Sequence, residues 1–436
     1  MADSIAVRTR PYRASSRDAA SRQLTDARRP WAEAILSSAA LSLLFVFVYG
    51  ECNALASRTT DLGTCFFAWE LRIPFVPPLI VPYMSIDLFF VASFLLCADR
   101  IELRAHARRI GAAIILAGLA FLVFPLTAGY PRPEVSGWAG SLFGLLWSFD
   151  EPHNLVPSLH VALASLLWPV YARHTPPKNH AWLRWFVHLW FTLIIASPLF
   201  TWQHHLLDVV TGAMLGQICI FAFPGWPERA PVRSASANFR VARLFSAGSA
   251  VLGIMAIALG SWFWLLVWPA ASLALISIAY VRGNSSVFRK SGGSLPISTR
   301  VVLGPYLCGT YLRLLIYRRR GEPWVEAAPG VYCGRLLTKR EARAVRSMGV
   351  TGVLDLTAEH AETQAFLGIE YLNVPVLDLT SPSREQLDTA VAFIAEHAGR
   401  GVYVHCALGI SRSVAAVSAY IDGERNRARL RCDHLS

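Results

Sequence analysis

Long apolar stretches fill most of the chain between residues 32 and 281, and they limit its fold more than any other feature of the sequence. About 20 apolar residues in a row are enough to cross a bilayer as a helix. We place such stretches at 32–50, 78–97, 110–127, 157–173, 183–200, 205–224, 244–260 and 262–281. The last two are separated only by Gly260-Ser261, so they also fit one re-entrant pair. The sequence therefore predicts an all-α polytopic membrane bundle of about eight spans.

The placement of charge indicates which side of the membrane each loop faces. Arginines crowd the N-terminal tail and the loops on the same side as that tail, whereas the opposite loops hold only Arg58, Arg72 and Arg132. Basic residues gather on the cytosolic side of membrane proteins, so we expect both termini in the cytosol. The net charge of +12 then reflects topology and attraction to anionic membrane lipids, and we expect no nucleic-acid partner. The arginine-rich, lysine-poor composition favours a multi-pass protein of a bacterial inner membrane.

Composition changes along the chain indicate several domains. We predict a basic cytosolic tail at 1–31, a membrane domain at 32–228, two additional spans at 229–281, an interfacial linker at 282–323 and a small α/β domain at 324–436. The last residues, 422–436, are polar and rich in arginine, with too few apolar side chains to complete a layer over a sheet. We therefore expect the α/β domain to be truncated at its C-terminus. Cys52 and Cys65 fall in one predicted outer loop, where an oxidising environment would allow a disulfide.

The C-terminal domain contains a Cys-x5-Arg loop, Val404-His405-Cys406-Ala407-Leu408-Gly409-Ile410-Ser411-Arg412-Ser413. A strand-like run precedes the loop and an apolar helical stretch, 414–421, follows it. In a strand–loop–helix unit, backbone N–H groups and the positive end of the helix converge on an anion. Arg412 adds a planar fork that binds phosphate in a bidentate manner.

The same field favours a thiolate, so Cys406 is predicted to be a nucleophile with a lowered pKa. Gly409 and Ser411 belong to the predicted phosphate cradle, Ser413 is placed to donate a hydrogen bond to the thiolate, and His405 is expected to brace the loop. The alternative is a buried structural cysteine with an arginine nearby by chance.

The string HCALGISRS resembles the active-site loop of the dual-specificity branch of cysteine phosphatases. The resemblance implies a phosphocysteine intermediate and a general acid, an aspartate on an upstream loop. Asp378, in Val376-Leu377-Asp378-Leu379-Thr380, follows an apolar run and precedes a helical stretch at 384–397, which is the family's position for the acid. The alternative for Asp378 is a turn or helix-capping residue.

Three polar clusters lie at the predicted outer ends of spans three to six: Tyr130-Pro131-Arg132-Pro133, the segment from His153 to His160, and Trp202-Gln203-His204-His205-Leu206-Leu207-Asp208. Ionisable groups at membrane spans are costly and indicate function. His204 and Asp208 are one helical turn apart, so the carboxylate can orient the imidazole as a nucleophile. We predict His160 as the general acid, with Ser158 and Arg132 as phosphate ligands. His205 lacks such a carboxylate and is left out of this role.

The PSLH string and the His-x3-Asp pair resemble the second and third motifs of the type 2 phosphatidic acid phosphatase superfamily. The match is best to the lipid phosphotransferase branch of this superfamily, which contains inositol phosphorylceramide and sphingomyelin synthases. Two departures stand out. Pro198 occupies the position where the third motif usually carries arginine, and the first motif survives only as Arg132-Pro133. Loss of that arginine is typical of the transferase branch and favours phosphoryl transfer over hydrolysis. Helix packing and capping by these histidines is the alternative.

The whole chain resembles bacterial fusions of these two families, and the resemblance implies two phosphate sites on opposite sides of one membrane. We expect a bifunctional phosphatase and phosphotransferase acting on lipid phosphate monoesters, with phosphocysteine and phosphohistidine intermediates and no metal or cofactor. Phospholipid substrates and anionic lipids are the expected partners. One alternative is a single-site enzyme, either a protein phosphatase or a lipid phosphotransferase, whose other domain is regulatory or inactive. Another is a lipid transporter or scaffold without enzymatic activity.

Overall fold

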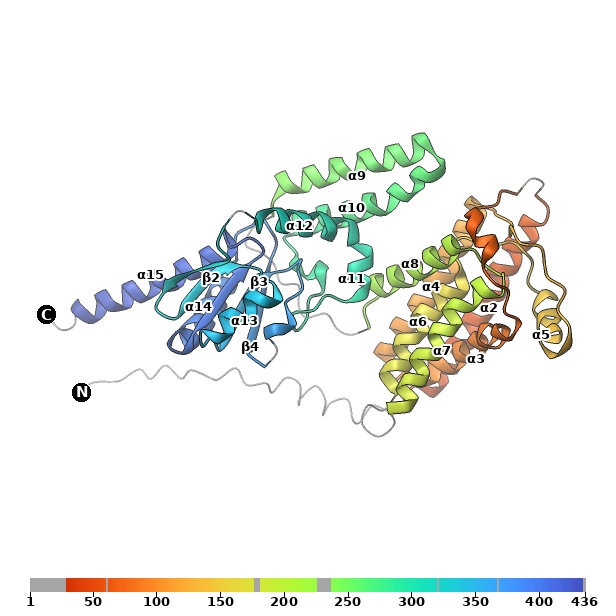
Figure 1. The fold of residues 1–436 in the computed structure, drawn as a ribbon, viewed down its shortest axis with the longest axis horizontal. Coiled ribbons are helices and arrows are strands. Elements are labelled where there is room, and N and C mark those ends of the chain that lie inside the picture. Colours follow the sequence, from red (N-terminus) through yellow and green to blue (C-terminus); the bar gives the residue numbers. More distant parts are fainter. Residues whose placement is uncertain are drawn as a thin grey trace. The chain divides into compact units, whose positions relative to one another are not determined.

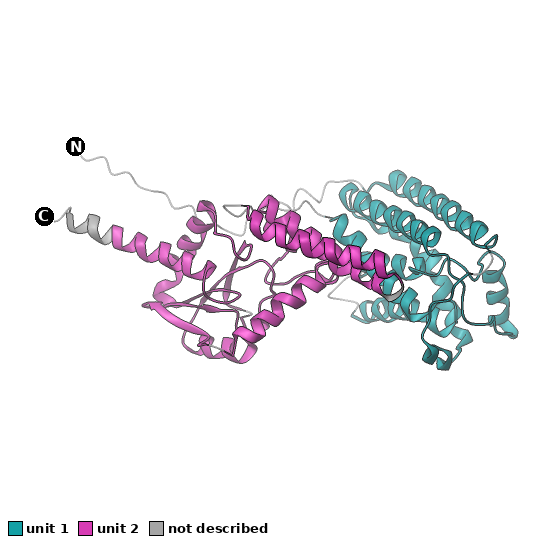
Figure 2. Cartoon of the chain, turned by 90° about the horizontal axis from the view of Figure 1, so that it is seen from above, with its two compact units in different colours: residues 1–226 teal, residues 227–436 magenta. Residues whose placement is uncertain are grey.

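The chain separates into two compact units, residues 1–226 and 227–436 (Figure 2). The computed structural model describes residues 29–59, 62–175, 181–225, 237–319, 321–366 and 368–433. Almost all of the predicted basic tail, 1–28, lies outside these residues.

The first unit is a bundle of helices (Figure 1). They are α2 (Trp31–Ala56), α3 (Ile80–Leu96), α4 (Arg100–Val123), α5 (Gly137–Trp147), α6 (Leu159–His174), α7 (Ala181–Phe200) and α8 (Leu206–Ala222), with short 3-10 turns η1 (Ala68–Arg72) and η2 (Pro77–Leu79). The start that we predicted for the third span, residue 110, is wrong. Asp99 caps α4, because its side chain accepts hydrogen bonds from the backbone N–H groups of Ile101 and Glu102, both at 2.8 Å. α5 was not predicted.

Each predicted apolar stretch is helical, and six helical segments in the described part of the chain have the length and composition to cross a membrane. These segments are Trp31–Ala56, Pro77–Leu96, Arg100–Val123, Ala181–Phe200, Phe239–Leu259 and Phe263–Arg282. α6 and α8 have 16 and 17 residues, which is shorter than the usual span of about 20. The described part of the chain is therefore largely helical and contains six candidate membrane spans rather than the eight predicted stretches.

Two glycines bring α6 and α8 into close contact. A Cβ atom on Gly212 would lie 2.3 Å from the Ser158 carbonyl oxygen, and one on Gly216 would lie 2.7 Å from the Ser165 Cβ. Small residues spaced by four on a helix let two backbones approach in this way. The packing holds the N-terminal ends of both helices together, and these ends carry the PSLH and His-x3-Asp strings.

The disulfide considered for Cys52 and Cys65 is absent, and both thiols are free. Cys52 lies within α2 rather than in an outer loop, and its thiol contacts the Gly118 carbonyl oxygen of α4 at 3.6 Å. The apolar stretch of α2 extends beyond the predicted end at residue 50, which moves Cys52 from the loop into the bundle.

The second unit begins with a helical hairpin, α9 (Phe239–Leu259) and α10 (Val267–Arg282), joined through Gly260 and η3 (Ser261–Leu266) (Figure 1). Gly260 has a φ of 56°, which glycine adopts at little cost. The predicted linker forms η4 (Ser285–Phe288), α11 (Ile297–Val302) and α12 (Gly304–Tyr317). An aromatic cluster of Phe245, Tyr280, Phe288 and Tyr306 joins these elements, with ring centroids 5.6 to 5.9 Å apart.

The remainder of the second unit is a five-stranded sheet in the order β1-β2-β5-β3-β4. Its strands are β1 (Trp324–Ala328), β2 (Val331–Arg335), β3 (Gly352–Thr357), β4 (Glu370–Val376) and β5 (Val402–Cys406), and only β1 runs antiparallel to its neighbour. Parallel strands are buried on both faces, which explains the fully buried β3 and β5.

Helices cover both faces of this sheet. α14 (Arg384–His397) and α15 (Arg412–Asp433) contribute Ala390, Phe393, Ile394, Ala416 and Val417 to the apolar core on one face. α13 (Lys339–Ser347) contributes Ala342 and Val345 to a second core around Tyr403. The polar segment that we expected to follow residue 421 continues α15 as a helix to Asp433.

Candidate active sites

The backbone of the Cys-x5-Arg loop wraps around the sulfur of Cys406, which is the last residue of β5. The Gly409 N–H donates to the Cys406 sulfur at 3.3 Å, and the Ser413 hydroxyl lies 3.4 Å from the same atom. Gly409 has a φ of 77°, and a Cβ atom there would lie 2.7 Å from the backbone carbon of Gly334. Only glycine therefore fits this turn of the loop.

The loop stabilises the thiolate form of Cys406. Burial alone would raise the pKa of this thiol, but the Arg412 charge, the Ser413 hydroxyl and the backbone N–H groups of Ser413 and Gly409 bring the pKa below its ordinary value. This direction agrees with the expectation for a nucleophilic cysteine. Ser411 is exposed at the end of the loop, and its carbonyl oxygen accepts the Ala415 N–H at 2.8 Å.

Arg412 is buried and held by Glu359, a residue that the sequence analysis missed. Two parallel hydrogen bonds of 3.0 and 2.7 Å join the guanidinium to the Glu359 carboxylate, and a third goes to the Val376 carbonyl oxygen at 2.8 Å. Burial opposes the charge on Glu359, yet Arg412 lowers the pKa of this carboxyl to about 2. The fork of Arg412 is thus fixed before any phosphate binds.

Asp378 lies on the loop after β4 and reaches the same arginine. Its Oδ1 is 3.2 Å from Nη2 of Arg412, and its Oδ2 is 2.8 Å from Nη2 of Arg313 on α12. Ser383, rather than Asp378, caps α14, because the Ser383 hydroxyl accepts the Gln386 N–H at 3.2 Å. Asp378 is thus next to the predicted phosphate cradle, and its role as the general acid stays a prediction.

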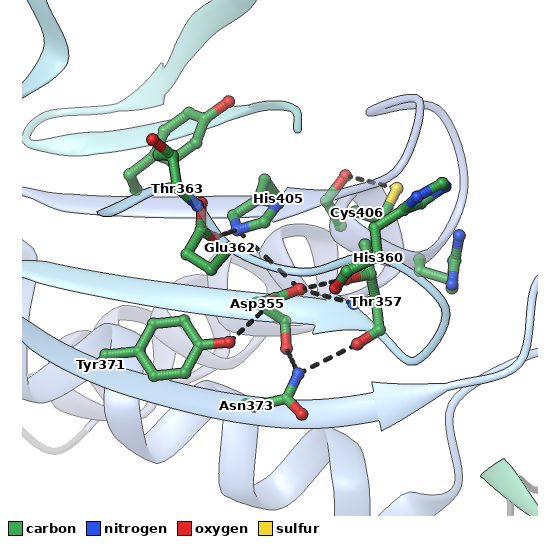
Figure 3. A network of polar contacts seen from close by, with 12 residues as sticks. Asp355, Thr357, His360, Glu362, Thr363, Tyr371, Asn373, His405 and Cys406 are labelled. Atoms are coloured by element: carbon green, nitrogen blue, oxygen red, sulfur yellow. Dashed lines mark hydrogen bonds and ion pairs between the residues drawn. The ribbon is translucent and has the colours of Figure 1, made fainter. Parts of the chain in front are cut away.

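His405 is buried beneath the loop in a network of charged groups (Figure 3). Its Nε2 is 2.7 Å from a Glu362 carboxylate oxygen and 3.9 Å from one of Asp355. Burial lowers the pKa of His405, but these two carboxylates outweigh burial and raise it above its ordinary value. The predicted bracing role of His405 fits this position.

Lys290 of the linker enters the same network and forms an ion pair with Asp355. The Lys290 ammonium also donates to the hydroxyl of Thr357 at 2.7 Å, and the Tyr371 hydroxyl donates to Asp355 at 2.7 Å. Asp355, Glu362 and His405 place three potential metal-ligand atoms within 4.8 Å of one another. Lys290 already supplies a positive charge to this cluster, so we interpret it as structural.

The second candidate site lies at the turn between α7 and α8. The Pro198 carbonyl oxygen accepts the backbone N–H groups of Gln203 and His204, at 2.9 and 3.2 Å, and thereby shapes the turn. His204 Nδ1 is 3.3 Å from Asp208 Oδ2, as the one-turn spacing predicts, and both side chains are buried. The carboxylate is therefore placed to orient the imidazole.

A cavity opens next to His204. It is lined by Tyr49, Ala128, Tyr130, Pro131, Arg132, Pro133, Asp150, Glu151, Pro152, His153, Leu155, Trp202, Gln203 and His204. Arg132 is exposed, donates to the Asp150 carbonyl oxygen at 2.6 Å and lies over the Trp147 ring. Asp150, whose carboxylate accepts the Tyr49 hydroxyl at 2.6 Å, was missed because no motif marks it.

Two other predicted residues of this site, Ser158 and His160, are not among the residues that line the cavity. Ser158 is buried and caps α6, and its hydroxyl accepts the Val161 N–H at 3.3 Å. His160 stacks on Tyr83, and its Nε2 is 3.1 Å from the Ile194 carbonyl oxygen. The phosphate-binding role of Ser158 and the acid role of His160 stay predictions.

The reason for leaving His205 out of the nucleophile role, the lack of a carboxylate partner, is wrong: Glu70 lies next to it, and His205 is part of the bundle core. Its Nε2 accepts the Gly129 N–H at 3.0 Å, and its Nδ1 is 3.3 Å from Glu70. Glu70 was also missed by the sequence analysis, because it meets α8 only in the folded bundle. Its buried carboxylate accepts the Leu206 N–H at 2.8 Å at the start of α8.

A low-pKa cysteine and a buried arginine between a parallel strand and a helix define a cysteine-dependent phosphatase site. The comparisons with known families agree. A model described as "Polymorphic toxin system, DSP-PTPase phosphatase" matches residues 329–424, and a model of the PAP2 superfamily matches residues 106–231.

Dual specificity protein phosphatase 12 of Mus musculus is 42% identical over 102 residues, which are 22% of this chain and 30% of that protein. Dual specificity protein phosphatase 26 of Bos taurus is 30% identical over 158 residues, 31% of this chain and 72% of that protein. The Mus musculus form of phosphatase 26 is 31% identical over 178 residues, 37% of this chain and 78% of that protein. The chain thus spans less than a third of phosphatase 12 and most of phosphatase 26. It belongs to the dual-specificity phosphatases, and it joins that domain to a PAP2 superfamily domain.

Proposed function

We propose that the protein hydrolyses phosphate monoesters at Cys406 and that its substrates are membrane lipids. The observation that carries the proposal is the joint placement of Cys406, Arg412 and Asp378, in which one buried arginine contacts the acid and lowers the pKa of the thiol. Loop N–H groups and Arg412 bind the phosphate, as expected for a preorganised anion site.

The reaction follows from these positions. The Cys406 thiolate attacks phosphorus, the bond to the alcohol oxygen breaks, and Asp378 gives its proton to that oxygen. Water then attacks the phosphocysteine, with the Asp378 carboxylate accepting a water proton. The sulfur leaves as a thiolate, which the Ser413 hydroxyl stabilises, and inorganic phosphate is released.

The location of the acid loop supports a lipid substrate. α10 is part of a candidate span that ends at Arg282. Tyr280, two residues before this end, donates from its hydroxyl to the Asp378 carbonyl oxygen at 2.9 Å. Because one residue adds about 1.5 Å along a helix, the acid loop is close to the end of this candidate span, which supports its location near lipid head groups. A phosphoprotein substrate is the alternative. The distribution of basic residues among the loops supports a cytosolic location of this site.

For the membrane bundle we propose phosphoryl transfer through His204, on the opposite side of the membrane. The orientation of His204 by Asp208 and its exposure to the cavity beside Arg132 support this second activity. His204 attacks phosphorus, the bond to the first alcohol oxygen breaks, and His160, the predicted acid, gives that oxygen a proton. A second alcohol or water, which gives its proton to His160, then takes the phosphoryl group from the phosphohistidine.

The test measures phosphate release and transfer from a panel of phospholipid monoesters. It compares the full-length wild type with Cys406→Ser, His204→Ala and the double variant. We expect each single variant to lose a different substrate or product and the double variant to lose all turnover. Full turnover in Cys406→Ser would contradict the thiolate mechanism, and activity on phosphopeptides alone would replace lipids with proteins as the substrate.

A further inference from the structure

The loop that carries Asp378 is held from outside the phosphatase domain. The matched family model begins at residue 329, yet four residues between 238 and 313 bond the segment from Pro375 to Leu379. Asn238 donates to the Leu379 carbonyl oxygen at 2.8 Å, and Ser285 donates to the Pro375 carbonyl oxygen at 2.9 Å. Tyr280 and Arg313 supply the two contacts with Asp378 given above.

The conformation of this loop indicates that it needs such support. Leu379, directly after the acid, has a φ of 55° and an exposed side chain. Residues other than glycine adopt positive φ at a cost, and they keep it only where the surroundings enforce it. Asn238, which also caps α9, bonds the carbonyl oxygen of this strained residue.

The elements that hold the loop are themselves fixed. The aromatic cluster of Phe245, Tyr280, Phe288 and Tyr306 packs α9, α10, η4 and α12 together. α12 presents Tyr311, Leu312, Leu315 and Ile316 as exposed apolar side chains, which suits a helix at a lipid surface. Arg313, on the same helix, points its guanidinium at the acid instead.

We propose that the α9–α10 hairpin and α12 are part of the cytosolic active site and that Arg313 is a positioning residue for the general acid. This inference rests on the proposed phosphatase activity. Arg313 contacts Oδ2 and Arg412 contacts Oδ1, so the two guanidinium groups hold the carboxyl group of Asp378 from both of its oxygens. Arg313 thereby fixes the direction in which Oδ1 points, towards Arg412 and the Cys406 loop.

Arg313 keeps its role when substrate arrives. A bound phosphate competes for the Arg412 fork and weakens the contact of that fork with Asp378. Arg313 is then the charged group that still orients the acid. Its side chain is 47% exposed, so substituting it removes this contact without opening a core.

The experiment compares full-length wild type, Arg313→Gln and Arg313→Lys on 4-nitrophenyl phosphate and on an alkyl phosphate monoester. The aryl leaving group departs without a proton, whereas the alkyl leaving group needs the acid. General acids contribute roughly 10²- to 10⁴-fold, and we expect Arg313→Gln to lose at least about tenfold of kcat on the alkyl ester. The loss should be less than about twofold on the aryl ester, with KM unchanged and partial recovery in Arg313→Lys. Arg300→Gln, at an exposed arginine of α11, is the matched control and should match wild type.

A double variant separates positioning from a general structural effect. If Arg313 acts through Asp378, Arg313→Gln with Asp378→Asn is no slower on the alkyl ester than Asp378→Asn alone. Additive losses, or equal losses on both esters, would overturn the inference, as would no loss on either. Failure of the proposed function would look different, because Cys406→Ser would then retain wild-type turnover on both esters.

Discussion

The two candidate phosphate sites use similar residue types in different ways. Around Cys406, each cation of the site has a buried carboxylate partner: Arg412 has Glu359, Lys290 has Asp355 and His405 has Glu362. Beside His204, the arginine that we assigned to phosphate is exposed and rests on a carbonyl oxygen and an aromatic ring. A site with fixed charges is organised before the substrate binds, whereas the proposed phosphate ligand Arg132 is exposed and would be ordered by the substrate.

The largest expected effect is the loss of phosphoryl transfer when His204, but not its neighbour His205, is replaced. His204→Gln should abolish phosphoryl transfer and lower the thermal midpoint less than His205→Gln does, because a glutamine amide at this cavity-lining position can still donate to Asp208. His205→Gln should instead lower stability by about 1–3 kcal/mol, because it removes the partner of Glu70 and the acceptor of the Gly129 N–H. Both variants are measured in the Cys406→Ser background by phosphate transfer and thermal unfolding. Reversed patterns would assign the nucleophile to His205.

The next effect concerns the acid of the cysteine site. Asp378→Asn should slow hydrolysis of alkyl phosphates by roughly 10²- to 10⁴-fold and leave aryl phosphates nearly unaffected. Asp388→Asn, at an exposed aspartate of α14, controls for loss of a charge in the same unit. Equal slowing of alkyl and aryl esters would argue for a structural role of Asp378.

The fixed charges are tested by a matched pair of glutamates. Glu359→Gln leaves Arg412 without its buried countercharge, so the free energy of unfolding should fall by about 3–5 kcal/mol. Glu341→Gln breaks the pair with Arg335, where the glutamate is a quarter exposed, and should lower the free energy of unfolding by less than Glu359→Gln does. Denaturant unfolding measures both. Equal costs would mean that the Arg412 pair is not special to the site.

The smallest expected effect is the change in the pH dependence of stability when Glu359 is replaced. Glu359 and Asp355 each have a pKa of about 2 in the folded protein, below their ordinary values of 4.5 and 3.8. A lowered pKa contributes stability that is fully present above the ordinary value and is lost as pH falls towards about 2. We expect the unfolding free energy to fall through this window, and to fall less steeply in Glu359→Gln. Parallel pH profiles for the two proteins would contradict the assignment.

The contrast also explains what the sequence could reveal. Cys406, Gly409, Arg412 and Ser413 lie within eight residues, so strand–loop–helix geometry fixed their arrangement in advance. The bundle site draws on segments far apart in the chain, and only the one-turn spacing of His204 and Asp208 was local enough to predict. Whether Ser158 faces a cavity or caps α6 depends on how α6 packs against α8, which spacing does not encode.

Other features were beyond sequence reasoning because they depend on long-range contacts. Glu359 and Arg412 are 53 residues apart in the sequence. Arg313 contacts Asp378 only once the linker has packed against the sheet. The helical stretches, by contrast, were predictable from the length of the apolar segments alone. The exception is α4, which begins at Arg100 after the Asp99 cap rather than at the predicted residue 110.

Lys290 changes how the catalytic domain can search for substrates. A domain on a slack tether sweeps a volume of cytosol and samples whatever diffuses through it. Here the segment that follows α10 is bound to the sheet, because the buried Lys290 ammonium contacts Asp355 and Thr357 of β3. The phosphatase domain is therefore not connected to α10 by a flexible linker. With the α9–α10 hairpin in a bilayer, as we propose, turnover on the proposed lipids should follow their surface density rather than their bulk concentration.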